Sequence, residues 1–148
     1  MRKYLELAIS IAVLAAPAGG ATLPATPNYA ADNPGADQVW STKKIMDKVH
    51  VGKQSLFSLV YKDIHKAEPD WETDEKNLAE IIGLMSMLTR HKPPRGSQEA
   101  WDKLVQEYVQ NAKVTQQNVK EYKLLPARAS LEKVLSTCDE CHDNHGIQ

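Results

Sequence analysis

The 148-residue chain has few cysteines and almost no excess charge, and each shortage excludes a class of protein. Two cysteines are too few for a small scaffold held together by several disulfides. The formal net charge of −1 lacks the basic excess of a typical nucleic-acid-binding protein, so no nucleic-acid partner is expected. With 42% hydrophobic and 25% charged residues, the composition is that of a soluble globular domain, not of a disordered or collagen-like chain.

Long hydrophobic runs are also missing, which decides how the N-terminal segment is interpreted. Arg2 and Lys3 precede a mostly apolar stretch over residues 5–16, shorter than the roughly 20 residues needed to span a bilayer. Small residues follow as far as Ala21, and this order is typical of a secretory signal peptide. We therefore expect a signal peptide over residues 1–21 and a periplasmic protein, with a retained N-terminal anchor as the alternative.

The segment after the expected cleavage point favours irregular structure. Residues 22–36 contain three prolines, one glycine and two asparagines, so they are predicted to form a flexible linker. The folded domain is then expected over residues 37–148.

Strand signals are scarce from residue 37 onward, whereas apolar residues recur at helical spacing in four segments. These segments cover residues 37–65, 73–90, 97–122 and 126–146. Thr73 and Ser97 are expected N-caps, and Gly146 is expected to end the last helix. Because each helix has one apolar stripe to bury and the connections are short, the sequence predicts an all-α fold, an antiparallel four-helix bundle.

The segment with the most chemical content is Cys138-Asp139-Glu140-Cys141-His142. Cys-x-x-Cys-His is the attachment signature of c-type haem. Positions i, i+3 and i+4 share one face of a helix, so both thiols can bind the two vinyl groups of one porphyrin. The imidazole of His142 then becomes the proximal ligand of the iron. We therefore predict one covalently attached haem c, held by Cys138, Cys141 and His142.

Three other interpretations of the motif remain open. A thiol–disulfide redox centre needs a thiolate favoured at a helix N-terminus, whereas this pair lies near the end of the last helix. A zinc site would use Cys138, Cys141, His142 and His145, four ligands crowded into eight positions. A plain disulfide in a haem-free structural bundle is the third. The chain has no glycine-rich phosphate loop and no Ser-His-Asp arrangement, so it is not expected to be an enzyme.

A four-helix chain with Cys-x-x-Cys-His close to its C-terminus resembles the class II c-type cytochromes, the cytochrome c-prime family. The proline–glycine link over residues 93–97, Trp101 and the approach to the motif over residues 134–138 resemble the family as well. The resemblance implies a periplasmic monohaem electron carrier with transient redox partner proteins, in a family where homodimers are common. His145 departs from it, since the family often has an aromatic residue there. It is expected to be solvated at a frayed helix end, with contact to a haem propionate as the alternative.

The resemblance also ties the function to the sixth position of the iron. Family members with a methionine from the first helix on the iron are suited to electron transfer, whereas those with an apolar residue there bind nitric oxide or carbon monoxide. Met46 lies in a segment similar to that of the methionine-ligated members and is the predicted sixth ligand. His50, one turn later, is the alternative ligand, and a different registration puts Val51 over an open, gas-binding iron. Five aromatic residues are candidates to line the haem: Trp40, Phe57, Trp101, Tyr108 and Tyr122.

Overall fold

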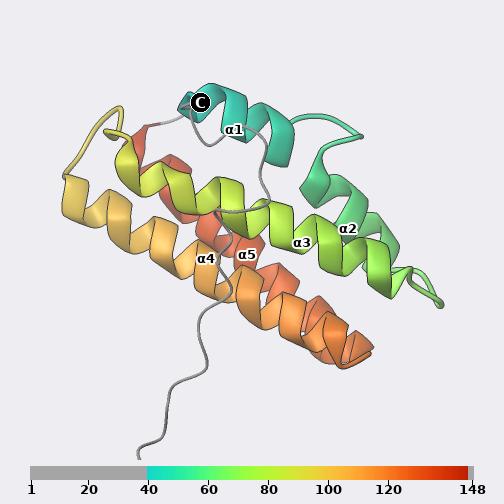
Figure 1. Ribbon diagram of the computed structural model, residues 1–148. Coiled ribbons are helices and arrows are strands. Elements are labelled where there is room, and N and C mark those ends of the chain that lie inside the picture. The colour runs from blue at the N-terminus through green and yellow to red at the C-terminus, as the bar shows by residue number, and fades with distance from the viewer. Residues whose placement is uncertain (1–39, 147–148) are drawn as a thin grey trace, which may run out of the picture.

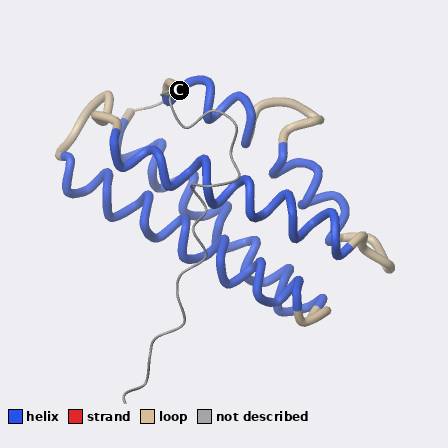
Figure 2. The backbone as a smooth tube through the Cα atoms, viewed as in Figure 1, coloured by secondary structure: helices blue, strands red, loops and turns tan. Residues whose placement is uncertain are grey.

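The computed structural model describes residues 40–146, which form helices joined by short loops (Figures 1 and 2). In chain order, the helices are α1 (Thr42–Val49), α2 (Leu56–Ile64), α3 (Trp71–Ser86), the 3-10 helix η1 (Met87–Arg90), α4 (Gln98–Lys120) and α5 (Leu124–His145). No strand occurs in this part of the chain, so the all-α class predicted from the sequence is confirmed for it. The predicted signal peptide (1–21) and linker (22–36) lie outside the described residues.

The first helical segment is divided in two, so the prediction of one helix over residues 37–65 is wrong. The chain leaves α1 at His50 and turns at Gly52, whose φ of 91° is in the left-handed region that an α-helix does not contain. Ser55 then starts a new helix, because its side chain accepts a hydrogen bond from the Ser58 backbone N–H and so caps the N-terminus of α2.

The three long helices form the main packing unit. Helix α4 makes its most extensive contacts with α3 and α5, and these three consecutive helices run in alternating directions (Figure 1). Helix α2 packs on α3 and also touches α5, whereas α1 has the fewest contacts of the five α-helices. The core between them is apolar and includes the fully buried residues Ile45, Val60, Ile64, Leu78, Ile81, Leu88, Trp101, Val119, Leu131 and Val134.

The helix ends explain where the predicted boundaries hold and where they shift. Ser97 caps α4 as predicted, since its side chain accepts from the Ala100 N–H. Gly146, with φ of 61°, ends α5 as predicted. The N-cap of the helix predicted over 73–90 is Asp70 and not Thr73, because the Asp70 carboxylate accepts the Thr73 N–H.

Two further boundaries differ from the prediction. The last turn of the 73–90 segment tightens into η1 (Met87–Arg90). The last helix begins at Leu124, two residues before the predicted start at Pro126. Helix α4 ends at Lys120, so Tyr122 lies beyond it. No helix among residues 40–146 combines the length and the apolar character needed to cross a membrane.

Candidate functional site

The Cys-x-x-Cys-His motif lies in the last two turns of α5, which stays helical as far as His145. Cys138, Cys141 and His142 therefore share one face of a single helix, as the spacing predicts. Both cysteines are free thiols, partly buried and packed against the hydrophobic core, whereas His142 is exposed. Along this face the two thiols pack against the core, and the imidazole of His142 is accessible to solvent.

The surroundings of the two thiols keep them protonated. Burial raises the pKa of the Cys138 thiol to about 12, and the negative charge of Asp139 adds to the increase. Burial, together with the negative charge of Glu140, also raises the pKa of Cys141. A thiol–disulfide exchange centre works through a thiolate whose pKa is lowered. These electrostatics therefore disfavour the dithiol redox alternative.

Three side chains from different helices meet beside the motif, and we call His50, Phe57 and Tyr108 the aromatic cluster. The Tyr108 hydroxyl of α4 and Nε2 of His50 lie 3.1 Å apart and share a hydrogen bond. The His50 ring also lies 5.3 Å from the Phe57 ring, between centroids, and edge-on to the Tyr108 ring at 5.6 Å. The end of α1, the start of α2 and the middle of α4 therefore converge at one point.

Electrostatic coupling shows that the aromatic cluster lies close to the motif. Burial, together with the charge of His142, lowers the pKa of His50 to about 4. Burial raises the pKa of the Tyr108 hydroxyl well above its ordinary value, and Cys138 contributes to that increase. Two members of the aromatic cluster are thus influenced by the motif: Tyr108 by Cys138, and His50 by His142.

The three candidates for the sixth iron position lie at or just after the end of α1. Met46 is partly buried and packs at the edge of the core, one turn before His50 and on the same side of the helix. His50 is half-buried in the aromatic cluster. Val51 lies in the turn after α1 with 62% of its surface exposed, so its side chain does not line the interior.

Two of the five aromatic residues predicted to line a haem, Phe57 and Tyr108, belong to the aromatic cluster. Trp101 is fully buried outside that cluster, where its indole N–H donates to the Leu88 carbonyl at 2.8 Å and its ring packs against His145 of the last turn of α5. Trp40 lies beneath the ammonium group of Lys44, 4.2 Å from the ring centroid. Tyr122 is 71% exposed, so including it among the lining residues was wrong.

His145 is buried, which overturns the prediction of a solvated residue at a frayed end. Its side chain is 1% exposed, and its Nδ1 lies 2.6 Å from the Arg95 carbonyl oxygen in the loop before α4. Its ring packs edge-on against Trp101, with 5.1 Å between centroids. Gly96 approaches so closely that a Cβ there would lie 3.2 Å from His145 Nδ1. These contacts fix the last turn of α5 to the loop between η1 and α4.

The burial of His145 also bears on the zinc interpretation. Nδ1 of His145 is already engaged by the Arg95 carbonyl, and its ring packs against Trp101. Within residues 40–146, no group of three or more histidine, cysteine, aspartate or glutamate side chains is arranged to hold a metal ion. Sequence reasoning missed the role of His145, although its spacing of four from Cys141 continues the buried stripe of α5.

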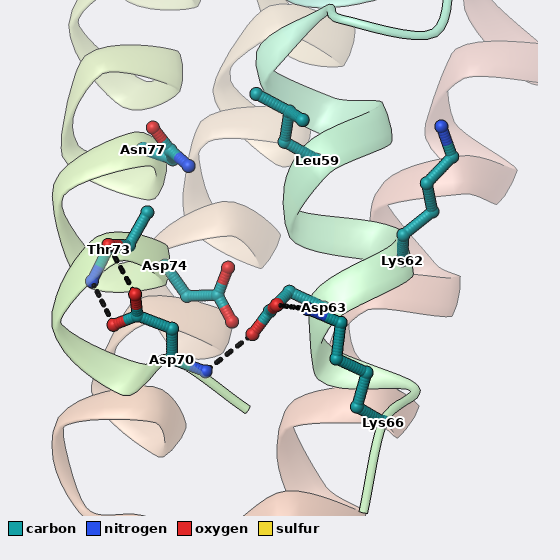
Figure 3. A pocket seen from close by; sticks show the side chains of 8 residues that line it. All are labelled: Leu59, Lys62, Asp63, Lys66, Asp70, Thr73, Asp74 and Asn77. Carbon is teal, nitrogen blue, oxygen red and sulfur yellow. Dashed lines mark hydrogen bonds and ion pairs between the residues drawn. The ribbon is translucent and has the colours of Figure 1, made fainter. Parts of the chain in front are cut away.

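A separate cavity of about 300 Å³, lined mainly by polar and charged residues, lies between the end of α2 and the start of α3 (Figure 3). Asp63 and Asp74 face one another across it, and Asp74 is 1% exposed with its Oδ2 unpartnered (Figure 3). Burial raises the pKa of Asp74 to about 7, and the charge of Asp63 adds to the increase. Lys66 forms an ion pair with Asp63 at the mouth of the cavity. The sequence analysis did not single out this cavity.

The cavity is not part of the motif site. Arg128, near the start of α5, donates hydrogen bonds to the carbonyl groups of Ile64 and Lys66 at the end of α2, whereas the motif occupies the last turns of α5.

In comparisons with known proteins, no family model, curated protein or solved structure matches the chain.

Proposed function

We propose that the chain is an exported monohaem c-type cytochrome that carries single electrons. One observation carries the proposal: Cys138, Cys141 and His142 lie on one face of α5. The thiols of the two cysteines pack against the core beside the aromatic cluster. A haem bound there supplies an iron centre that gains and loses one electron. Export to the periplasm follows the predicted signal peptide over residues 1–21.

The chemistry of the donor set fits covalent haem attachment. Each thiol would add across one vinyl double bond of the haem, with its sulfur bonding to one carbon and its hydrogen going to the other, so that no oxidant would be consumed. Cys138 and Cys141 are both free for this addition. His142, the next residue, carries the imidazole for the proximal position. The aliphatic core and the rings of Phe57 and Tyr108 would exclude water from the bound group, and such exclusion helps to set its potential.

Helix α1 is the element best suited to admit a porphyrin. It has the fewest contacts of the five α-helices and is joined to α2 through the turn at Gly52. We propose that α1 and α2 together take the place of the first helix in an antiparallel four-helix bundle of the cytochrome c-prime type. The alternating directions of α3, α4 and α5 support this arrangement (Figure 1).

The position of the motif also suits transient partners. His142 is exposed at the end of α5, so a redox partner protein can approach the site over a small surface. A five-coordinate form that binds nitric oxide or carbon monoxide is the alternative function. The exposure of Val51 gives no support to an apolar residue over the iron at that position. Carbon monoxide binding by the reduced protein separates the two functions, because a firmly held sixth ligand resists displacement.

The test is to produce the full chain in bacteria that mature c-type cytochromes in the periplasm. We expect a Soret band that stays with the denatured polypeptide after acid extraction, together with a mass increase of one haem. Cys138→Ser with Cys141→Ser should abolish covalent attachment. Ser136→Ala is the matched control, because Ser136 is exposed on the same helix and bonds only the Lys133 carbonyl. Haem-free protein from cells that mature another c-type cytochrome correctly would refute the proposal in favour of a structural bundle.

A further inference from the structure

We propose that His50, and not Met46, is the sixth iron ligand opposite His142. This inference rests on the proposed function, since it concerns a haem held by Cys138 and Cys141. It changes the expected site from a methionine–histidine centre to a centre with two imidazole ligands.

His50 makes specific contacts between the end of α1 and the surroundings of the motif. Its Nε2 shares a hydrogen bond with the Tyr108 hydroxyl, and its ring packs against those of Phe57 and Tyr108. Tyr108 in turn lies close enough to Cys138 for the two side chains to interact electrostatically. The charge of His142 acts on His50 in the same way. His50 therefore lies near the motif, at the C-terminal end of α1.

Met46 lies one turn before His50 on the same side of α1, and its side chain is partly buried against the core. A flexible thioether commonly fills such irregular gaps, and this packing role accounts for Met46 without any bond to a metal.

The hydrogen bonding of His50 suits a ligand. The Tyr108 hydroxyl shares a hydrogen bond with Nε2 of His50, which leaves Nδ1 as the nitrogen for the iron. Metal-binding histidines are commonly fixed in this way by a second hydrogen-bonding partner, which sets the orientation of the ring. His50 and Tyr108 therefore resemble a ligand and its supporting partner.

Spectra of the haem-loaded full chain test the inference. We expect the oxidised parent protein to be low-spin, to lack the weak far-red charge-transfer band of methionine-ligated iron, and to give the electron paramagnetic resonance signal of bis-imidazole ligation. His50→Ala should convert the iron to a high-spin form that binds carbon monoxide after reduction. Met46→Leu should leave the spectrum unchanged, as should the control Val51→Ala in the exposed turn.

Three outcomes would overturn the inference. One is a far-red band in the parent protein that disappears in Met46→Leu, and another is a high-spin parent protein that binds carbon monoxide directly. The third is a chain without covalent haem, which would remove the proposed function together with this inference and is recognised by the missing Soret band. A far-red band, a high-spin spectrum and a missing Soret band are each visible in the parent protein, so the three cases can be told apart even where a variant fails to fold. Tyr108→Phe adds a further measurement: loss of the hydrogen bond to His50 should shift the midpoint potential and leave the ligand in place.

Discussion

Replacing Asp74 with asparagine is expected to change the pH dependence of folding stability. In the folded protein, burial and the facing carboxylate of Asp63 raise the pKa of Asp74 from 3.8 to about 7. Between these two values the unfolded chain has lost the proton and the folded protein still binds it. Stability from this group is therefore fully present below the lower value, and it decreases as the pH rises towards the higher one.

The magnitude follows from the width of that interval. Each pH unit of difference corresponds to about 1.4 kcal/mol, so the whole contribution of Asp74 is on the order of 4 kcal/mol. His50 acts in the opposite direction, because its pKa is lowered from 6.5 to about 4 and its contribution is lost as the pH falls. The pH dependence of folding stability in the parent protein therefore combines two opposing contributions. The difference between Asp74→Asn and the parent isolates the slope due to Asp74.

Urea unfolding followed by circular dichroism at about pH 5 and about pH 8 gives that difference. From about pH 5 to about pH 8, the free energy of unfolding of Asp74→Asn should rise by about 3 kcal/mol relative to that of the parent. The reason is that the asparagine does not have to be charged in the buried site. Glu99→Gln, an exposed change in the first turn of α4, serves as the control and should show no such gain. A difference that stays constant with pH would show that Asp74 is already ionised in the folded protein at neutral pH, and the reasoning from burial would be wrong.

Three further changes probe the fold by denaturant unfolding. His145→Ala should destabilise the protein by about 2–3 kcal/mol, because it removes a buried ring and leaves the Arg95 carbonyl without its partner; an effect below the error of the measurement would mean that the loop is not fixed to α5. Ser97→Ala should cost about 1 kcal/mol by removing the N-cap of α4, and Ser97→Asp should restore most of it. Gly52→Ala should cost about 1 kcal/mol because φ there is 91°, and a stabilising effect instead would indicate that α1 and α2 join into one helix.

The helical class and most helix ends were predictable because they depend on local residues. Ser97, Gly146 and the double proline at residues 93–94 act within one turn of their own position, and the structure keeps the boundaries that they predict. The division of the first segment was missed because the apolar spacing continues in phase across it. Only Gly52 and the capping residue Ser55 mark the break, and a periodicity that averages over many residues outweighs two such signals.

The site shows a similar limit. The spacing of Cys138, Cys141 and His142 predicts their common helix face without any knowledge of the fold. The neighbours of that face come from three other elements, so the meeting of His50, Phe57 and Tyr108 depends on tertiary packing. The burial of His145 depends on a loop that lies 50 residues earlier in the chain. Contacts of this kind leave no periodic trace in the sequence.

The turn that joins α1 to α2 has a consequence for how the site opens and closes. Residues 50–55 keep α1 attached to the rest of the described chain even when its few contacts are broken. The return of α1 is therefore an intramolecular event, governed by an effective concentration on the order of millimolar for a short flexible connection. Weak packing of α1 is then compatible with a site that is closed most of the time. Under the proposed function, a helix tethered in this way would be able to leave for the entry of a haem and then return to the same surface.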